Sequence, residues 1–268
     1  ALLNERLGLK GNQPQAVRRL RDKLAFRELL SAHGFNCPEF HPLPDNTNPA
    51  TLIPRLHFPV VVKARRLSAS RGVIRADNPQ QYLQATARVR EIQNKADREA
   101  AALGLVIESF IPGMEYALEG ILEDGQLKTL ALFDKPDLLD GPYFEETLYI
   151  TPSRLPQKTQ DEIQHAVRRA CQLAGLTTGP VHAEMRLNSK GIWLLEIASR
   201  SIGGLCGRVL RHALGMSIEE LILRQALGEK PPAPDFECAA GVMMIPIPMR
   251  GIYQGVRNLD LAGKLPGI

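Results

Sequence analysis

Apolar residues recur at helical spacing in several parts of the chain. Between residues 15 and 33 this spacing predicts one helix, and Gly34 suits its C-terminal end. Asn78 and Pro79 suit the cap and the first turn of another helix, which we expect to reach about Ala102. Three later helices are predicted over residues 159–174, from 203 to about 214, and from 217 to about 228.

Runs of apolar and β-branched residues predict strands between these helices. Asp124-Gly125 indicates a tight turn that joins two of the strands, and residues 38–54 form a Pro-rich connector. Because hairpins and helices are mixed along the chain, their order favours an α+β fold over a doubly wound α/β sheet. The expected strands cover residues 58–64, 105–111, 115–122, 126–133 and 239–245, and one more begins at Val73.

The most informative pattern is a predicted β-hairpin near residue 190. Two alternating segments flank the turn Asn188-Ser-Lys-Gly191. On the first strand His182, Glu184 and Arg186 share one face, because side chains alternate between the two sides of a strand.

The second strand of this hairpin brings another carboxylate to the same place. Glu196 is expected to lie near Glu184, with Arg200 just past the strand end. Clustered like charges are costly unless a cation lies between them, so the hairpin predicts a divalent-metal site beside an arginine. A solvated face with a weak ion pair is the alternative. The buried face of this strand is expected to consist of Trp193, Leu195 and Ile197.

Composition narrows the class of protein. Of 268 residues, 44% are hydrophobic and 23% charged, which is typical of a globular protein with a sizeable core. The net charge of +4 is small and its residues are dispersed, so we expect neither a nucleic-acid nor a membrane partner. Four isolated cysteines favour a reducing compartment over a zinc or disulfide framework, and we expect the cytoplasm. Both ends look cut, so part of a longer polypeptide is expected.

Two features upstream of the hairpin suggest contacts to a nucleotide. Lys63 ends an apolar strand and is followed by the small-residue loop 67–72, which could bring a cation and backbone N–H groups to phosphate oxygens. A lysine that reaches into water is the alternative. Glu108 lies in another apolar strand and needs a donor, either the amine of a purine or a buried Arg or Lys. The backbone of residues 109–111 offers an edge for a planar base.

The segment from Lys135 to Glu146 mixes charged and aromatic residues. It could line a substrate pocket, but an ordered surface loop is the reading that the sequence favours.

Taken in chain order, these motifs resemble the ATP-grasp superfamily of carboxylate–amine ligases. The resemblance runs from Arg21-Asp22-Lys23 to about Glu229. It implies an ATP-grasp fold in which two α+β lobes clasp ATP. The implied organisation is a leading helix and connector over 1–57, a smaller lobe over 58–112, a larger lobe over 113–237 and a C-terminal segment over 238–268.

The resemblance also implies roles for individual residues. Arg200 would be catalytic, and His182 would contact the substrate or help to accept the proton of the amine, with a structural histidine as the alternative. Mg²⁺, or Mn²⁺ in its place, would be held by Glu184 and Glu196. The implied contacts to ATP are Lys23, Lys63, Ser68, Ser70, Gly72, Glu108, Phe110 and Glu115.

One motif departs from much of the superfamily. The chain reads Glu196-Ile-Ala198-Ser-Arg200 where Glu-x-Asn-x-Arg is common, so Ala198 cannot supply a further metal ligand. This version resembles the branch of L-amino acid (dipeptide) ligases and carnosine-synthase-like enzymes, as does Gly203-Gly204.

The implied activity is ATP- and Mg²⁺-dependent joining of a small-molecule carboxylate to an amine, through an acyl phosphate and with release of ADP. Ligases of this sort often pair, so a homodimer is compatible with the resemblance. A non-catalytic nucleotide-binding module and a biotin-carboxylase-like enzyme are the alternatives.

Overall fold

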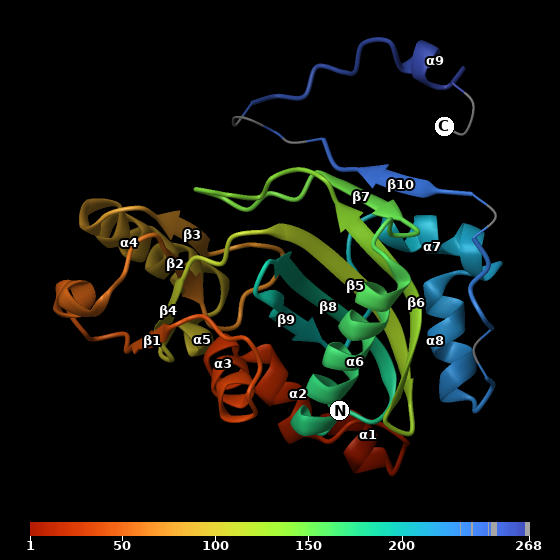
Figure 1. The fold of residues 1–268 in the computed structure, drawn as a ribbon, viewed down its shortest axis with the longest axis horizontal. Helices are drawn as coiled ribbons and strands as arrows, with labels where there is room; N and C mark the ends of the chain where they lie inside the picture. The colour runs from red at the N-terminus through yellow and green to blue at the C-terminus, as the bar shows by residue number, and fades with distance from the viewer. Residues whose placement is uncertain (231, 237, 246, 248–250, 266–268) are drawn as a thin grey trace.

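A computed structural model describes residues 1–230, 232–236, 238–245, 247 and 251–265. Two antiparallel sheets form its framework. The smaller has the strand order β1-β4-β2-β3, and the larger has the order β10-β7-β6-β5-β8-β9. Figure 1 shows them side by side.

The smaller sheet is built around two apolar central strands. Val62 of β2 and Ile107 of β4 are fully buried and pack with Tyr82 and Val89 of the long helix that covers the sheet. The elements are β1 (Phe40–Leu43), η1 (Pro49–Arg55), β2 (Val60–Ala64), β3 (Val73–Ala76), α4 (Pro79–Ala96), α5 (Arg98–Ala101) and β4 (Leu105–Ser109).

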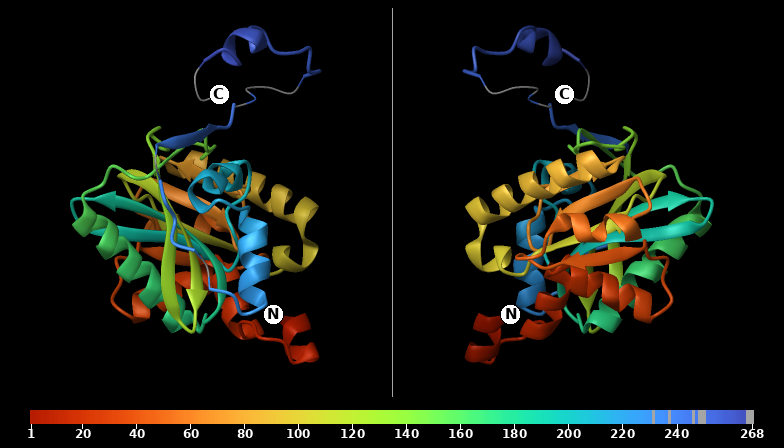
Figure 2. Two further views of the ribbon diagram at one scale, coloured as in Figure 1. Left: turned by 90° about the vertical axis from the view of Figure 1, so that its right-hand side faces the viewer. Right: turned by 90° about the vertical axis from the view of Figure 1, so that its left-hand side faces the viewer.

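The larger sheet is covered by helices on both faces. One face packs on α6, α2 and α3 through residues such as Leu118 and Met185, and the other packs on α7 and α8 through Ala117 and Ile121. Figure 2 shows the layers from either side. The helices are α2 (Pro14–Arg21), α3 (Lys23–Ala32), α6 (Gln157–Ala174), α7 (Cys206–Leu214) and α8 (Ile218–Ala226). The strands are β5 (Met114–Glu123), β6 (Gln126–Lys135), β7 (Leu148–Thr151), β8 (Gly179–Asn188), β9 (Gly191–Ala198) and β10 (Ala240–Met243).

Two predicted helices are each interrupted by an aspartate. The helix expected over 15–33 is α2 followed by α3, because Asp22 caps α3 by accepting a hydrogen bond from the Leu24 N–H at 3.1 Å. The helix expected to reach Ala102 ends at Ala96, and Asp97 caps α5 in the same way. An Asp side chain competes with the helix for backbone N–H groups, which explains both breaks.

Short elements account for the other differences from the expected pattern. The Pro-rich connector contains β1 and the 3₁₀ helix η1, and the four-residue β7 was not predicted. Neither were α1 (Leu2–Leu7) and α9 (Leu259–Ala262), which bury no residue. The predicted hairpins at Asp124-Gly125 and at 188–191 are present as β5–β6 and β8–β9.

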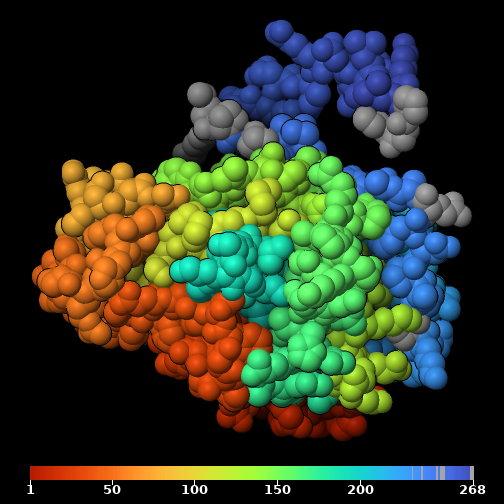
Figure 3. Space-filling model, viewed as in Figure 1, coloured from red at the N-terminus to blue at the C-terminus, as the bar shows by residue number. Residues whose placement is uncertain are grey.

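The change from one sheet to the other falls between β4, which ends at Ser109, and β5, which begins at Met114. Residues 237 and 266–268, where the expected larger lobe and C-terminal segment end, lie outside the described residues. Residues 251–265 stand apart from the body of the molecule (Figure 3). Among the described helices, none has the length and apolar character needed to cross a membrane.

Candidate functional site

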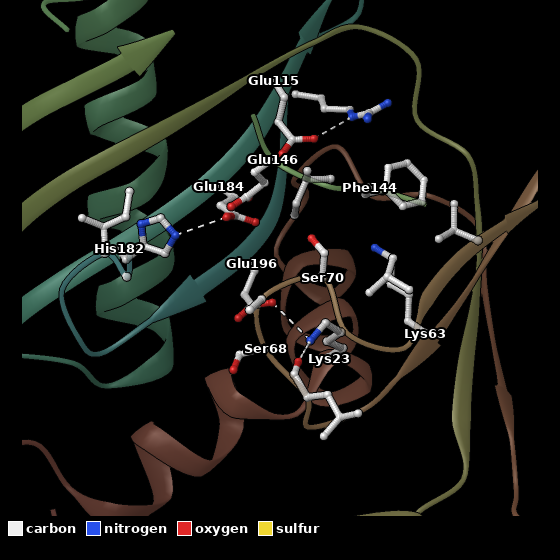
Figure 4. Close-up of a pocket in the computed structure, with 18 of the residues that line it drawn as sticks. Lys23, Lys63, Ser68, Ser70, Glu115, Phe144, Glu146, His182, Glu184 and Glu196 are labelled. Atoms are coloured by element: carbon white, nitrogen blue, oxygen red, sulfur yellow. Dashed lines mark hydrogen bonds and ion pairs between the residues drawn. The ribbon is translucent and has the colours of Figure 1, made fainter. Parts of the chain in front are cut away.

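A cavity of about 570 Å³ lies between the two sheets. Its volume is in the range of small-molecule sites. Every predicted site residue except Gly72 lines it, so residues far apart in the sequence come together there (Figure 4). The residues brought together are Lys23, Lys63, Ser68, Ser70, Glu108, Phe110, Glu115, His182, Glu184, Glu196 and Arg200.

Lys23 joins three parts of the cavity wall. It is the first residue of α3, and its Nζ donates to the Leu67 carbonyl at 2.5 Å and lies 3.2 Å from Glu196 Oε2. The ammonium is therefore held between the loop after β2 and the metal-binding strand predicted from the sequence (Figure 4).

Lys63 is fixed by a buried ion triplet. Its Nζ lies 2.7 Å from Glu108 Oε2, and Arg27 Nε lies 2.9 Å from Glu108 Oε1. Glu108 thus has the buried Lys and Arg partners that the sequence left open as the alternative to a purine amine. Arg27 was not predicted, because an arginine among the apolar residues of α3 carries no sequence signal of its partner.

The triplet shifts the pKa values of Glu108 and Lys63 for different reasons. Burial would raise the pKa of Glu108, but Arg27 and Lys63 outweigh burial and hold it at about 2. Burial lowers the pKa of Lys63, and the positive charge of Arg27 adds to this effect against the attraction of Glu108. The carboxylate is therefore the firmly ionised centre, because two cations attract it while they repel each other.

The loop after β2 brings two hydroxyl groups to the cavity. Ser68 and Ser70 both line it, and Ala69 and Ser70 adopt left-handed backbone conformations with φ of 57° and 53°. Such conformations in non-glycine residues cost about 1–3 kcal/mol each and cluster at ligand-binding segments. Gly72 lies outside the cavity wall, where its carbonyl accepts a hydrogen bond from the Ala64 N–H at 2.8 Å and closes the loop.

Glu184 and Glu196 are direct partners across β8 and β9. The register shifts between Glu184 and Met185, so that Leu195 has no partner and Met185 faces Leu194. This bulge makes the expected buried face wrong at two positions. Leu194 and Ile197 are in the core, whereas Leu195 lines the cavity and Trp193 is half-buried.

Three carboxylates surround the buried Lys135. Its Nζ lies 2.7 Å from Glu115 Oε1, 2.7 Å from Glu146 Oε1 and 3.6 Å from Glu184 Oε1. Burial would lower the pKa of Lys135, but the three acids raise it well above its usual value. Burial would raise the pKa of Glu184, but Lys135 and His182 hold it well below the usual range.

The prediction of a surface loop over 135–146 is correct for its middle, where residues 137, 138 and 141–143 are exposed, but not for its ends. Phe144 and Glu146 line the cavity, and Lys135 is 2% exposed. Burial and the nearby Glu184 raise the pKa of Glu146. The mixture of charge and aromatic residues was the available signal, but a single segment cannot show which surface it faces.

His182 is enclosed by carboxylates on both sides. Its Nδ1 lies 2.5 Å from Glu119 Oε1 and its Nε2 lies 3.3 Å from Glu184 Oε1. Burial would lower the pKa of His182, but Glu119 and Glu184 raise it to about 10. A protonated ring would donate from both nitrogens to these two carboxylates, and the expected contact of His182 with the substrate or with the proton of the amine stays a prediction.

Arg200 is an exposed residue of the cavity wall. Its Nη1 donates to the Ser201 carbonyl at 2.9 Å, and residues 200–204 continue the cavity wall. Ala198 is paired with His182 on β8 and has no ligand atom to offer. Phe110 lies under two guanidinium groups, with Arg75 at 4.2 Å and Arg186 at 5.0 Å from the ring centroid.

The donor set fits a magnesium nucleotide. Glu184 and Glu196 supply oxygen ligands, which a hard divalent cation prefers. Lys23 and Lys63 place two ammonium groups on the same cavity wall, where phosphate oxygens would need them.

Comparisons with known proteins agree with this geometry. Alanine–anticapsin ligase of Bacillus subtilis (strain 168) is 25% identical, and the match covers 82% of this chain and 49% of that protein. Carnosine synthase 1 of Gallus gallus is 29% identical over 91% of this chain and 28% of that protein. The crystal structure of L-amino acid ligase from Bacillus licheniformis matches with a TM-score of 0.78 and 27% identity, and covers 99% of this chain and 63% of that chain.

The chain therefore spans less than two thirds of each of these relatives. The sequence profile of the ATP-grasp domain matches residues 56–209, which is more than half of the chain. That range contains Lys63, both paired glutamates and Arg200. The fold, the cavity and this match together show that the chain belongs to the ATP-grasp family.

Proposed function

We propose that this chain is the ATP-grasp core of a ligase that activates a carboxylate as an acyl phosphate and joins it to an amine. The observation that carries the proposal is the direct pairing of Glu184 and Glu196 in a cavity that Lys23, Lys63 and Arg200 also line. The related proteins named above are ligases or synthases, and two of their names specify amino acids. An amino acid or a dipeptide-type compound is therefore the substrate class that we infer.

The lysines would bind the phosphates of ATP. Glu108 and Arg27 hold Lys63 at the cavity wall, so its ammonium is preorganised and loses little freedom when phosphate binds. Lys23 is tied to the loop through the Leu67 carbonyl, so the loop residues Ser68 and Ser70 and this lysine would act on the same phosphate groups.

Glu184 and Glu196 would hold Mg²⁺ at the phosphates. Mg²⁺ would neutralise charge on the transferring phosphoryl group, and Mn²⁺ is expected to replace it. Lys135 and His182 keep the Glu184 carboxylate ionised and fixed in orientation, as a metal ligand requires.

Arg200 would stabilise the oxyanion that forms when the amine attacks the acyl phosphate. Loss of one such donor typically lowers the rate by about a hundredfold. The loop with Ser68 and Ser70 would close over the acyl phosphate and exclude water, which otherwise hydrolyses it. His182 would contribute its positive charge beside the reacting groups.

The test is ADP release by the full-length parent protein with Mg-ATP and a panel of amino acids, offered singly and in pairs. Release that needs a particular pair, together with a condensed product by mass spectrometry, would support the ligase. ATP binding without ADP release for any pair would instead indicate a nucleotide-binding module. Incorporation of labelled bicarbonate would indicate the biotin-carboxylase-like alternative. A homodimer and a cytoplasmic location remain predictions of the same proposal.

A further inference from the structure

Glu119 is a buried acid that does not line the cavity. It lies on β5, it is 1% exposed, and it is the direct partner of His182 on β8. Its side chain shares one face of the larger sheet with the apolar residues Ala117 and Ile121, which pack under α7 and α8. A carboxylate in such surroundings costs free energy unless its oxygens are well bonded.

Both oxygens of Glu119 are bonded, and to two different parts of the site. Oε1 accepts from His182 Nδ1 at 2.5 Å, and Oε2 accepts from the backbone N–H of Ile202 at 2.9 Å. His182 in turn reaches Glu184 at 3.3 Å, and Ile202 lies two residues after Arg200. One carboxylate thus connects the predicted metal ligand to the segment that carries the predicted catalytic arginine.

Stability does not explain this arrangement well. A buried ion pair is often no more stabilising than well-packed apolar residues of similar volume, because desolvation offsets the attraction. Leu210 and Cys206 of α7 are fully buried in the core cluster on this face, so an apolar residue at position 119 would meet apolar neighbours. Placement of His182 and Ile202 is what the carboxylate adds.

We infer that Glu119 is a positioning residue, which sets Glu184 and the Arg200 segment relative to each other. The inference rests on the proposed function for the roles of Glu184 and Arg200. Glu119 would touch neither substrate nor metal. It would act through the His182 ring on one side and the Ile202 N–H on the other.

Two substitutions separate charge from geometry. Glu119→Leu removes both contacts. Glu119→Gln keeps an amide oxygen for the Ile202 N–H and an amide NH₂ that can face a neutral His182, so the geometry should survive. Asp134→Asn is the matched control, because Asp134 is also a buried acid of the same sheet, but its partners Ser153 and Arg154 lie outside the cavity.

Three readouts are measured on the full-length protein, and two of them do not need turnover. Mn²⁺ affinity in the presence of ADP is measured by electron paramagnetic resonance, amide exchange of residues 199–204 by mass spectrometry, and kcat by ADP release. Loss of a residue that orients a metal ligand typically lowers metal affinity or activity by about 10–100-fold. We expect Glu119→Leu to show such a loss of Mn²⁺ affinity and of kcat, with faster exchange at 199–204. For Glu119→Gln we expect Mn²⁺ affinity, amide exchange and kcat close to those of the unsubstituted protein. Asp134→Asn should change none of these three quantities.

If Glu119→Leu does not fold, Ile202→Pro tests the contact between Glu119 and Ile202 by itself, because proline has no N–H for Glu119 to bind. This variant should exchange faster at 199–201 and lose turnover while it keeps its Mn²⁺ affinity. Unchanged Mn²⁺ affinity and unchanged exchange in folded Glu119→Leu, or unchanged exchange in Ile202→Pro, would overturn the inference. Failure of the proposed function would be seen in the unsubstituted protein, as absent amide formation, and the exchange measurement would still decide the role of Glu119.

Discussion

Glu184 and Glu196 are direct partners across β8 and β9, and each also has a cationic neighbour. Glu184 lies near Lys135, and Glu196 lies near Lys23. Each carboxylate thus already has a cationic partner, and a divalent cation bound by both would further offset the repulsion between them. This arrangement leads to the first prediction.

Glu196→Ala should abolish Mg²⁺-dependent ATP turnover in the full-length protein while the fold survives. Glu196 is 26% exposed, and Lys23 keeps its hydrogen bond to the Leu67 carbonyl, so the fold should survive the loss of this ion pair. ADP release and thermal unfolding measure the two effects. Glu162→Ala, an exposed glutamate on α6, is the control. Normal turnover in Glu196→Ala would mean that this carboxylate does not hold the metal.

Glu108→Ala should be strongly destabilising. The substitution leaves Arg27 and Lys63 buried without an anion, and breaking a buried ion pair in this way costs about 3–5 kcal/mol.

Lys63→Met should cost less stability than Glu108→Ala, because Arg27 still pairs with Glu108, but it should weaken ATP binding. Urea unfolding and nucleotide titration separate these outcomes. Glu91→Ala, which breaks exposed pairs on α4, should cost about 1 kcal/mol or less. Equal losses in Glu108→Ala and Glu91→Ala would contradict the proposed triplet.

The same carboxylate predicts a dependence of stability on acid pH. The pKa of Glu108 is lowered from 4.5 to about 2 in the folded protein, so the ionised carboxylate is more stable in the folded state than in the unfolded state. Its contribution, about 3 kcal/mol for a shift of this size, is present above pH 4.5 and is lost as the pH falls toward 2. Unfolding free energies measured from pH 6 to pH 2 should therefore fall less in Glu108→Gln than in the unsubstituted protein. Parallel curves for the two proteins would refute this assignment.

Gly141→Ala should disturb the cavity from a distance. Gly141 has φ of 94°, and a Cβ there would lie 2.9 Å from Arg75 Cβ on β3. The neighbouring Pro142 carbonyl accepts from the Arg75 N–H at 2.9 Å, so this contact docks the segment that carries Phe144 and Glu146 onto the smaller sheet. We expect weaker nucleotide or substrate binding, in addition to the loss of stability that the positive φ itself causes.

Gly125→Ala is the control for that substitution. Gly125 also has a positive φ, 79°, but no atom lies within 4 Å of a Cβ there. Both variants carry the backbone strain of a left-handed alanine, about 1–2 kcal/mol. Only Gly141→Ala should change ligand binding, as measured by calorimetric titration. The same affinity in both variants would show that the contact with Arg75 does not shape the cavity.

Local patterns predicted the elements that bear the site. The alternation of 179–187 and the turn at 188–191 were sufficient to place His182, Glu184 and Arg186 on one face of β8. The apolar run that ends at Lys63 likewise predicted β2. These features rest on the two-residue period of a strand and on turn chemistry, both of which act over a few residues.

The same local rules failed where a neighbouring strand or a capping side chain decided the outcome. The bulge in β9 moved Leu195 into the cavity wall and Leu194 into the core, because the register depends on β8 as well as on β9. Asp22 ended one helix and capped the next, so that Lys23 occupies the first position of α3 and faces the cavity.

The sequence by itself determined the α+β class, the hairpin with its two glutamates, and the set of residues whose chemistry suits a magnesium nucleotide. Only the tertiary structure decided the partners of the charged groups: Arg27 and Lys63 for Glu108, three acids for Lys135, and Glu119 for His182. The physical reason is that a buried charge must find an opposite charge at close range, whatever its distance along the chain. Arg27 and Glu108 are 81 residues apart in sequence, and no local pattern joins them.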